Sequence, residues 1–273
     1  MPDFSFFETI AHPTQQEGSY PTFVANVIDC AKLSKDYDFV KSKDQIETHG
    51  AFVKLKQQSA GVFYERVYEF SFSLMYPRII LKLQKQLPVN YVDFYEFYEG
   101  LFNHYLMNKN TLSEHARMGM KFFICGIYGC MNNSVLYSRP DFQSIIATYG
   151  FNIMSQEFKR SNVISINTDT IYMMSSDWNK DKLRLENYGM GSVDVEVHSS
   201  AIFFGPKRYI FGGRTKGLQA CKKVVDPIVD DIEYFEGKGT PAALTQAEIL
   251  KRNEIIASFE RPIPKEFIYD DGS

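Results

Sequence analysis

The stretch Val163-Ile-Ser-Ile-Asn167-Thr-Asp169-Thr-Ile-Tyr172 decides the fold of this chain. Apolar and β-branched residues form two short arms around a polar Asn-Thr-Asp tip, a pattern that predicts a β-hairpin. Asx residues also occupy turns for purely backbone reasons, so the tip alone does not define a site. The hairpin nevertheless makes Asp169 the first candidate for chemistry that needs an exposed carboxylate.

Composition describes an ordinary folded protein. The chain has 273 residues, of which 44% are hydrophobic and 23% charged, and these values are typical of globular domains. The net charge of −3 provides no overall basic field, so any contact with nucleic acid must come from a local patch. The start of the sequence lacks the features of a signal peptide, and no apolar run approaches the roughly 20 residues of a membrane span. We therefore expect a cytoplasmic protein with no membrane partner.

Cysteine and histidine positions do not indicate a metal centre. Cys30, Cys125, Cys130 and Cys221 fit neither a zinc cluster nor a disulfide framework, which predicts free thiols in a reducing compartment. The spacing of four histidines does not match that of metal ligands either; these are His12, His49, His115 and His198.

The order of the expected elements indicates an α+β fold. We expect strands at residues 50–54, 61–70, 193–198 and 201–211, the last broken at Gly205-Pro206, in addition to the hairpin. We expect helices at residues 21–31, 78–87, 93–107, 113–128, 141–147, 218–232 and 244–259. Ser113 is a suitable N-cap, and the short turn before it makes the helices at 93–107 and 113–128 an antiparallel hairpin. Gly150 is expected to end the helix that begins near Asp141, and residues 178–191 read as a polar stretch.

Four segments resemble, in the same order, the sequence motifs of family B DNA polymerases. Residues 70–80, Phe-Ser-Phe-Ser-Leu-Met-Tyr-Pro-Arg-Ile-Ile, resemble motif A, Asp-x-x-Ser-Leu-Tyr-Pro-Ser-Ile-Ile. Residues 121–129, Lys-Phe-Phe-Ile-Cys-Gly-Ile-Tyr-Gly, resemble motif B, Lys-x-x-x-Asn-Ser-x-Tyr-Gly. Residues 167–170 resemble motif C, Asp-Thr-Asp-Ser, and residues 206–209 resemble the Lys-Lys-Arg-Tyr motif, followed at 215–218 by a match to the entry of the thumb. Each match is short, but their order and intervals extend the resemblance over about residues 50–235.

This resemblance implies a polymerase palm, an antiparallel sheet with helices, that carries a helical-hairpin fingers insertion and a short partial thumb. It assigns residues 61–80 and 130–212 to the palm, 81–129 to the fingers and 213–273 to the partial thumb and C-terminal tail, with 1–60 as an N-terminal segment. No segment resembles the family's proofreading exonuclease. We therefore expect the core of a compact or split polymerase of viral origin that acts in the host cytosol, with any exonuclease on a separate chain.

The implied activity is template-directed transfer of dNTPs to a primer 3′ end with two divalent cations, Mg²⁺ or Mn²⁺. Alignment on Tyr76-Pro77 puts Ser71, a neutral hydroxyl, where the motif A aspartate should stand. In motif C, Asp169 is retained as a metal ligand but its companion is the uncharged Asn167. Glu69 points to the same face of a strand as Ser71 and is the candidate second metal ligand, or else a solvated strand residue. Loss of one ligand charge would slow the reaction thousands-fold or more at ~1.36 kcal/mol per tenfold in rate.

The resemblance also assigns substrate contacts. Lys121 would meet the incoming phosphates, Tyr76 would exclude a ribose 2′-OH, and Tyr128, Gly129 and Cys125 would border the nascent base pair. The Arg and Lys of the family's fingers helix are replaced by His104 and by Asn108 or Lys109. Primer-template DNA would be held by a local basic patch, made of Lys207, Arg208, Tyr209, Arg214, Lys216, Lys222 and Lys223.

The residues leave three interpretations open. The chain is a family B polymerase core, or it is a catalytically impaired relative that serves as a DNA-binding or assembly scaffold in a replication complex. Ser71, Asn167 and the missing fingers arginine favour the scaffold. The third interpretation, an unrelated α+β protein with chance motifs, requires that the hairpin at 163–174 does not face the strand at 66–74.

Overall fold

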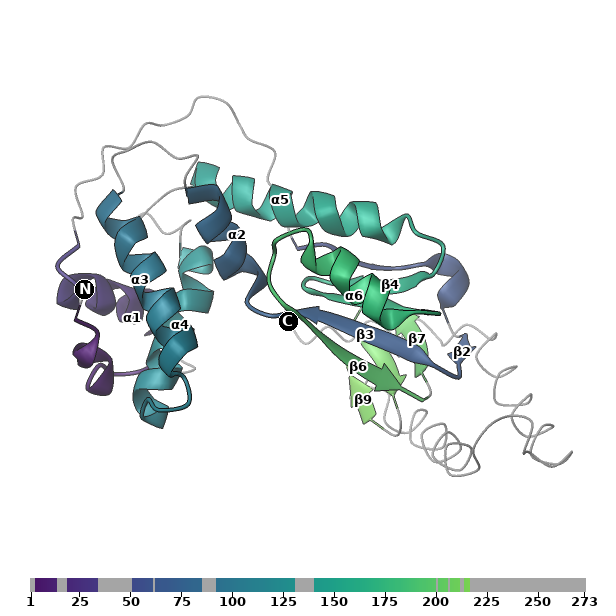
Figure 1. The fold of residues 1–273 in the computed structure, drawn as a ribbon, viewed down its shortest axis with the longest axis horizontal. Helices are drawn as coiled ribbons and strands as arrows, with labels where there is room; N and C mark the ends of the chain where they lie inside the picture. The colour runs from purple at the N-terminus through teal and green to yellow at the C-terminus, as the bar shows by residue number, and fades with distance from the viewer. Residues whose placement is uncertain are drawn as a thin grey trace, which may run out of the picture. The chain divides into compact units, whose positions relative to one another are not determined.

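The computed structural model describes residues 3–13, 19–33, 51–60, 62–84, 92–130, 140–199, 201–205, 207–211 and 214–216. They fall into two compact units, each described here by itself. The first unit is helical in its described part and comprises Met1–Gly50, Leu74–Phe151 and Gly189–Gly191. The second comprises Ala51–Ser73, Asn152–Tyr188 and Ser192–Ser273 and contains both β-sheets (Figure 1).

The described elements of the first unit are η1 (Ser5–Glu8), α1 (Ser19–Cys30), α2 (Met75–Leu83), α3 (Val92–Asn108), α4 (Glu114–Cys130) and the first part of α5 (Pro140–Phe158). The predicted helical hairpin is confirmed as α3 and α4. The buried Tyr98 hydroxyl on α3 donates a 2.9 Å hydrogen bond to the Ile124 carbonyl on α4. Ser113 caps α4 as expected, since its Oγ accepts from the Ala116 N–H at 3.1 Å.

The larger sheet of the second unit contains β1 (Val53–Leu55), β3 (Val67–Phe72), β4 (Val163–Asn167), β5 (Thr170–Met173) and β6 (Val193–His198). Its strand order is β1-β4-β5-β3-β6, and all neighbouring strands are antiparallel. The predicted hairpin is confirmed as β4 and β5, with Asn167 opposite Thr170. Thr170 in turn pairs with Ser71 on β3, so the hairpin lies beside the motif A strand. This pairing argues against the third interpretation of the sequence.

The smaller sheet contains β2 (Phe63–Tyr64), β7 (Ala201–Gly205), β8 (Arg208–Phe211) and β9 (Arg214–Lys216), in the order β2-β7-β8-β9. An aromatic core joins the two sheets, and its buried members are Val67, Ile164, Tyr172, Ala201, Phe203, Tyr209 and Phe211. Tyr68, Phe70 and Phe72 are also buried, and they alternate along β3 with residues that point to the opposite face. One face of β3 carries Val67, Glu69 and Ser71. The aromatic core covers this face at the Val67 end, and the face is polar at the Ser71 end.

Two predictions about helices were wrong. The α5 helix does not end at Gly150, because Ile146 and Met154, one turn on either side, are both buried. Their packing outweighs the roughly 1 kcal/mol that a helical glycine costs. The polar stretch at 178–191 contains a helix, α6 (Trp178–Glu186), which packs along β6 (Figure 1).

The α6 helix is held by polar contacts as well as by burial of Leu185. Asp177 is its N-cap and accepts from the Lys180 N–H at 3.1 Å. Arg184 forms an ion pair with the buried Glu157 of α5. The helices expected at 218–232 and 244–259 lie outside the described residues, and no helix within the described part has the length and apolar character needed to cross a membrane.

Candidate functional site

The tip of the β4–β5 hairpin has a strained but well-fixed backbone. Thr168 and Asp169 form its two-residue loop, and Thr168 has φ +57°. A positive φ at the first loop residue alone is typical of a type II′ turn, in which glycine is usual. The Thr168 N–H donates to the Phe52 carbonyl and the Phe72 N–H donates to the Asp169 carbonyl, both at 2.8 Å. Hydrogen bonds from both flanking strands therefore hold the exposed Asp169 in place.

A row of polar residues crosses the sheet next to this tip. Asn167, Thr170, Ser71 and Asp194 are successive partners on β4, β5, β3 and β6. Partners in antiparallel strands point to the same face with Cβ atoms about 4.5–5.5 Å apart. The exposed Asp194 therefore brings a carboxylate beside Ser71, the position that lacks one in motif A.

Sequence reasoning missed Asp194. A signal was present in Val193-Asp-Val-Glu-Val-His198, where valines alternate with titratable residues. That alternation predicts one apolar and one polar face, but it does not reveal that Ser71 lies on the neighbouring strand.

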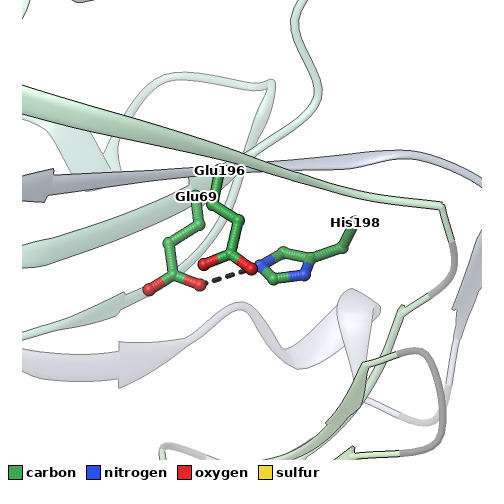
Figure 2. Close-up of side chains that lie close together, drawn as sticks. All are labelled: Glu69, Glu196 and His198. Carbon is green, nitrogen blue, oxygen red and sulfur yellow. Dashed lines mark hydrogen bonds and ion pairs between the residues drawn. The ribbon is translucent and has the colours of Figure 1, made fainter.

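A second polar row lies one pleat further along the same face. Glu69 is opposite Glu196, and His198 follows two residues later on β6. The Glu69 Oε2 lies 2.8 Å from the His198 Nε2, and Figure 2 shows the Glu196 carboxylate directed toward the same imidazole. One ligand atom from each of the three side chains lies within 4.8 Å of the other two. His198, which shows no metal-ligand spacing in the sequence, therefore belongs to a cluster that forms only through strand pairing.

Short polar contacts connect the two rows. Thr170 Oγ1 lies 3.3 Å from Asp169 Oδ1 and 3.0 Å from Ser71 Oγ. Ser71 Oγ lies 3.4 Å from Glu69 Oε1. The two hydroxyls supply only two hydrogens for these three contacts. If the shortest contact, between the hydroxyls, is kept, only one of the two carboxylates receives a hydrogen bond at a time.

Tyr172 lies between this polar face and the aromatic core. Its hydroxyl donates a 2.9 Å hydrogen bond to the Tyr209 hydroxyl. Burial raises the pKa of Tyr172 well above its ordinary value, and the Tyr209 hydrogen bond and the Glu69 carboxylate act in the same direction. Tyr172 therefore stays neutral, and beside Glu69 it borders the polar face with an uncharged hydroxyl.

The residues expected to bind the nucleotide lie in the first unit. The Tyr76 and Tyr128 rings stack with centroids 4.5 Å apart and an interplanar angle of 13°. Lys121, Cys125 and Gly129 are exposed on α4. Although the Cys125 residue is exposed as a whole, partial burial of its thiol raises the thiol pKa, and the Lys121 ammonium opposes this effect. His104, at the expected fingers position, contacts Asn108 through its carbonyl and ring.

The expected DNA-binding residues differ in their surroundings. Lys207 is exposed with φ +62°, Arg208 is half-buried and Tyr209 is buried in the aromatic core. Arg214 and Lys216 belong to β9 and pair with Phe211 and Tyr209 of β8. Two further members of the expected patch, Lys222 and Lys223, lie outside the described residues.

Several solved structures resemble this chain in fold. A family B DNA polymerase from the archaeon Pyrobaculum calidifontis matches with a TM-score of 0.55 and 13% identity, over 89% of this chain and 37% of that one. The fold resembles that of family B DNA polymerases. The DNA polymerase of phi29 bound to primer-template DNA matches with a TM-score of 0.52, and the same enzyme bound to single-stranded DNA with 0.54, both at 10% identity. These matches cover 71% and 76% of this chain and 54% and 56% of the phi29 chain.

The chain thus spans from about a third to just over half of these polymerases. No family model and no curated protein sequence matches it. At this identity the likeness to family B polymerases concerns the fold, a mixed arrangement of helices and antiparallel sheet compatible with a polymerase palm.

Proposed function

We propose that the chain is the core of a template-directed DNA polymerase of the family B type, which adds dNTPs to a primer 3′ end. The observation that carries the proposal is the position of Asp169, at the tip of a hairpin whose neighbouring strand holds the motif A segment. The larger sheet would serve as the palm and the α3–α4 hairpin as the fingers. The segment 213–273, of which the structure describes only β9, would form a partial thumb and C-terminal tail.

The acidic residues fit divalent cations in type, although they depart from the family's pattern. Hard cations such as Mg²⁺ prefer carboxylate oxygens, and Asp169 supplies one. Ser71 supplies only a neutral hydroxyl, but Asp194 lies opposite it in the next strand. We infer that Asp169 and Asp194 together hold the cations, Mg²⁺ or Mn²⁺, with Ser71 and Asn167 as neutral neighbours. Bound cations would activate the primer 3′ oxygen and stabilise the leaving pyrophosphate.

The remaining residues would bind substrates. Lys121 would attract the triphosphate of the dNTP, and the stacked Tyr76 and Tyr128 would form an aromatic surface for its sugar and base. Lys207 and Arg208 would contact primer-template phosphates, which positions DNA without reading its sequence. Since Tyr209 is buried, it would support that segment rather than touch the strand.

A second candidate function is a DNA-binding or assembly scaffold without catalysis, which would act beside a separate chain that carries an exonuclease or other polymerase parts. The neutral Ser71 and Asn167 favour it. The Ser71 hydroxyl is also already engaged with Thr170 and Glu69.

Primer extension with Mg²⁺ and with Mn²⁺ tests the proposal, with primer-template binding measured by fluorescence anisotropy. We expect slow extension that Asp169→Ala and Asp194→Ala each reduce at least about a hundredfold, with DNA binding retained. Glu96→Gln on the exposed face of α3 is the matched control. DNA binding without extension in any metal would support the scaffold instead, and activity gained in the Ser71→Asp, Asn167→Asp double variant would show that only the acids were lost. An absence of both activities would contradict both functions.

A further inference from the structure

We propose that Glu69, Glu196 and His198 form a binding site for a divalent transition-metal ion, Zn²⁺ or Mn²⁺, that is separate from the cations of nucleotidyl transfer. The three side chains come from two adjacent strands, β3 and β6, whose register is continuous over six residue pairs. Their ligand atoms already lie within 4.8 Å of one another, so an ion could bind without backbone movement (Figure 2).

The pairing of two glutamates is the feature that calls for a cation. Glu69 and Glu196 are directly opposite each other in the sheet, and like charges at such positions repel. His198 touches the Glu69 carboxylate at 2.8 Å and is the third member of the cluster. A divalent ion between the three groups would compensate both carboxylates at once, which a single imidazole cannot do.

The imidazole is held in the orientation that a ligand needs. Its ring stacks on Phe211, with centroids 4.0 Å apart and an interplanar angle of 20°. The Nε2 atom faces the carboxylates (Figure 2). Ser71 Oγ contacts the Glu69 Oε1 at 3.4 Å and so orients the carboxylate from the other side. Supporting contacts of this kind are typical of metal sites in proteins.

Ligand type and position distinguish this site from the catalytic cations. Imidazole together with carboxylates suits Zn²⁺ and Mn²⁺, whereas Mg²⁺ prefers oxygen ligands alone. Glu69 and Ser71 are two residues apart on β3, which corresponds to about 6.8 Å along a strand. The two cations of nucleotidyl transfer lie only about 3.5–4 Å apart. Glu196 and His198 lie two and four residues from Asp194 along β6, so we place this ion apart from the cations at the Asp169 tip.

Metal titration of the full chain tests the site. Zn²⁺ binding is measured by calorimetry, Mn²⁺ binding by electron paramagnetic resonance, and Co²⁺ serves as a visible-absorption probe of nitrogen and oxygen coordination. We expect one Zn²⁺ ion per chain that competes with Co²⁺, whereas Mn²⁺ should also occupy the cation site at Asp169 and Asp194. Glu196→Gln and His198→Ala should each lower the Zn²⁺ affinity at least about tenfold. Glu96→Gln and Asp169→Asn should retain it.

Any one of three results would overturn the proposal of a separate metal site. Failure of the wild-type chain to bind Zn²⁺, Mn²⁺ or Co²⁺ would do so, as would binding that Glu196→Gln leaves unchanged. Loss of the ion in Asp169→Asn would mean that the site is not separate from the hairpin tip. Since His198→Ala also removes the Phe211 stacking, the shape-preserving Glu196→Gln variant keeps the test valid even if the histidine variant misfolds.

Discussion

The Phe72 N–H donates a 2.8 Å hydrogen bond to the carbonyl oxygen of Asp169. This bond joins the motif A strand to the tip of the hairpin that carries the candidate catalytic carboxylate. It also fixes a turn whose first residue, Thr168, has a left-handed backbone. Strain held in place by surrounding contacts is common at functional sites, and here it sets the direction in which Asp169 is presented.

Replacement of Thr168 by glycine should stabilise the protein. A β-branched residue with φ +57° is strained by about 1–2 kcal/mol, and glycine removes the strain at a smaller entropic cost. We expect Thr168→Gly to raise the free energy of unfolding by about 1 kcal/mol in urea titrations. The matched control is Thr9→Gly, because Thr9 has φ −126° and should lose stability. Equal losses in both variants would contradict a strained turn.

Tyr172 should make the stability of the second unit sensitive to high pH. Its pKa is raised in the folded state, so the folded protein keeps the neutral form while the unfolded chain ionises near pH 10. This contribution is complete below pH 10 and is lost as pH rises further. Tyr172→Phe should cost about 1 kcal/mol at pH 8 because it removes the hydrogen bond to Tyr209.

Above pH 10, the variant should lose stability less steeply than the wild-type chain, by up to about 1.4 kcal/mol per pH unit. Urea titrations between pH 8 and 11 measure the difference in slope. Parallel pH profiles of the two proteins would show that Tyr172 is not shielded from ionisation.

The β4–β5 hairpin could be predicted from the sequence because local chemistry determines it. Two β-branched arms around a two-residue loop specify β4 and β5, and the resemblance to motif A pointed to β3 as their neighbour. The helical hairpin of α3 and α4 could also be predicted, since Ser113 and the preceding turn mark where α4 begins. The two hairpins depend on residues that are close along the chain, whereas the pairing with β3 was expected from the family resemblance alone.

The polar face that carries Glu69, Ser71 and their partners on β6 could be predicted from the sequence only in part. Glu69 and His198 are 129 positions apart and meet only because β6 joins the sheet at β3. Asp194 enters the site for the same reason, which no local pattern reveals. Packing also overrode composition in two helices. Buried neighbours carry α5 through Gly150, and α6 forms from a polar segment through its Asp177 cap and the ion pair with Glu157.

Two glycines of the motif B helix should respond differently to alanine. A Cβ on Gly126 would overlap the Tyr20 hydroxyl, which donates to the Phe122 carbonyl. Among the described residues, a Cβ on Gly129 would meet no atom within 4 Å. We expect Gly126→Ala to cost about 1–3 kcal/mol because Tyr20 must move, whereas Gly129→Ala should be neutral or slightly stabilising. Thermal unfolding of both variants measures this, and a harmless Gly126→Ala would mean that Tyr20 does not pack on α4.

Alkylation of Cys125 should report the charge of Lys121, one helical turn away on α4. The thiolate is the reactive form, partial burial raises the pKa of the Cys125 thiol, and the Lys121 ammonium lowers it. Removal of this cation in Lys121→Ala should raise the pKa further and slow the reaction of Cys125 with iodoacetamide at pH 8 by about twofold. Lys121→Arg keeps the charge and should keep the rate, and Lys109→Ala, in the exposed turn after α3, is the control. Peptide mass spectrometry separates Cys125 from the other three cysteines. Equal rates in Lys121→Ala and Lys121→Arg would show that the Lys121 charge does not act on the Cys125 thiol.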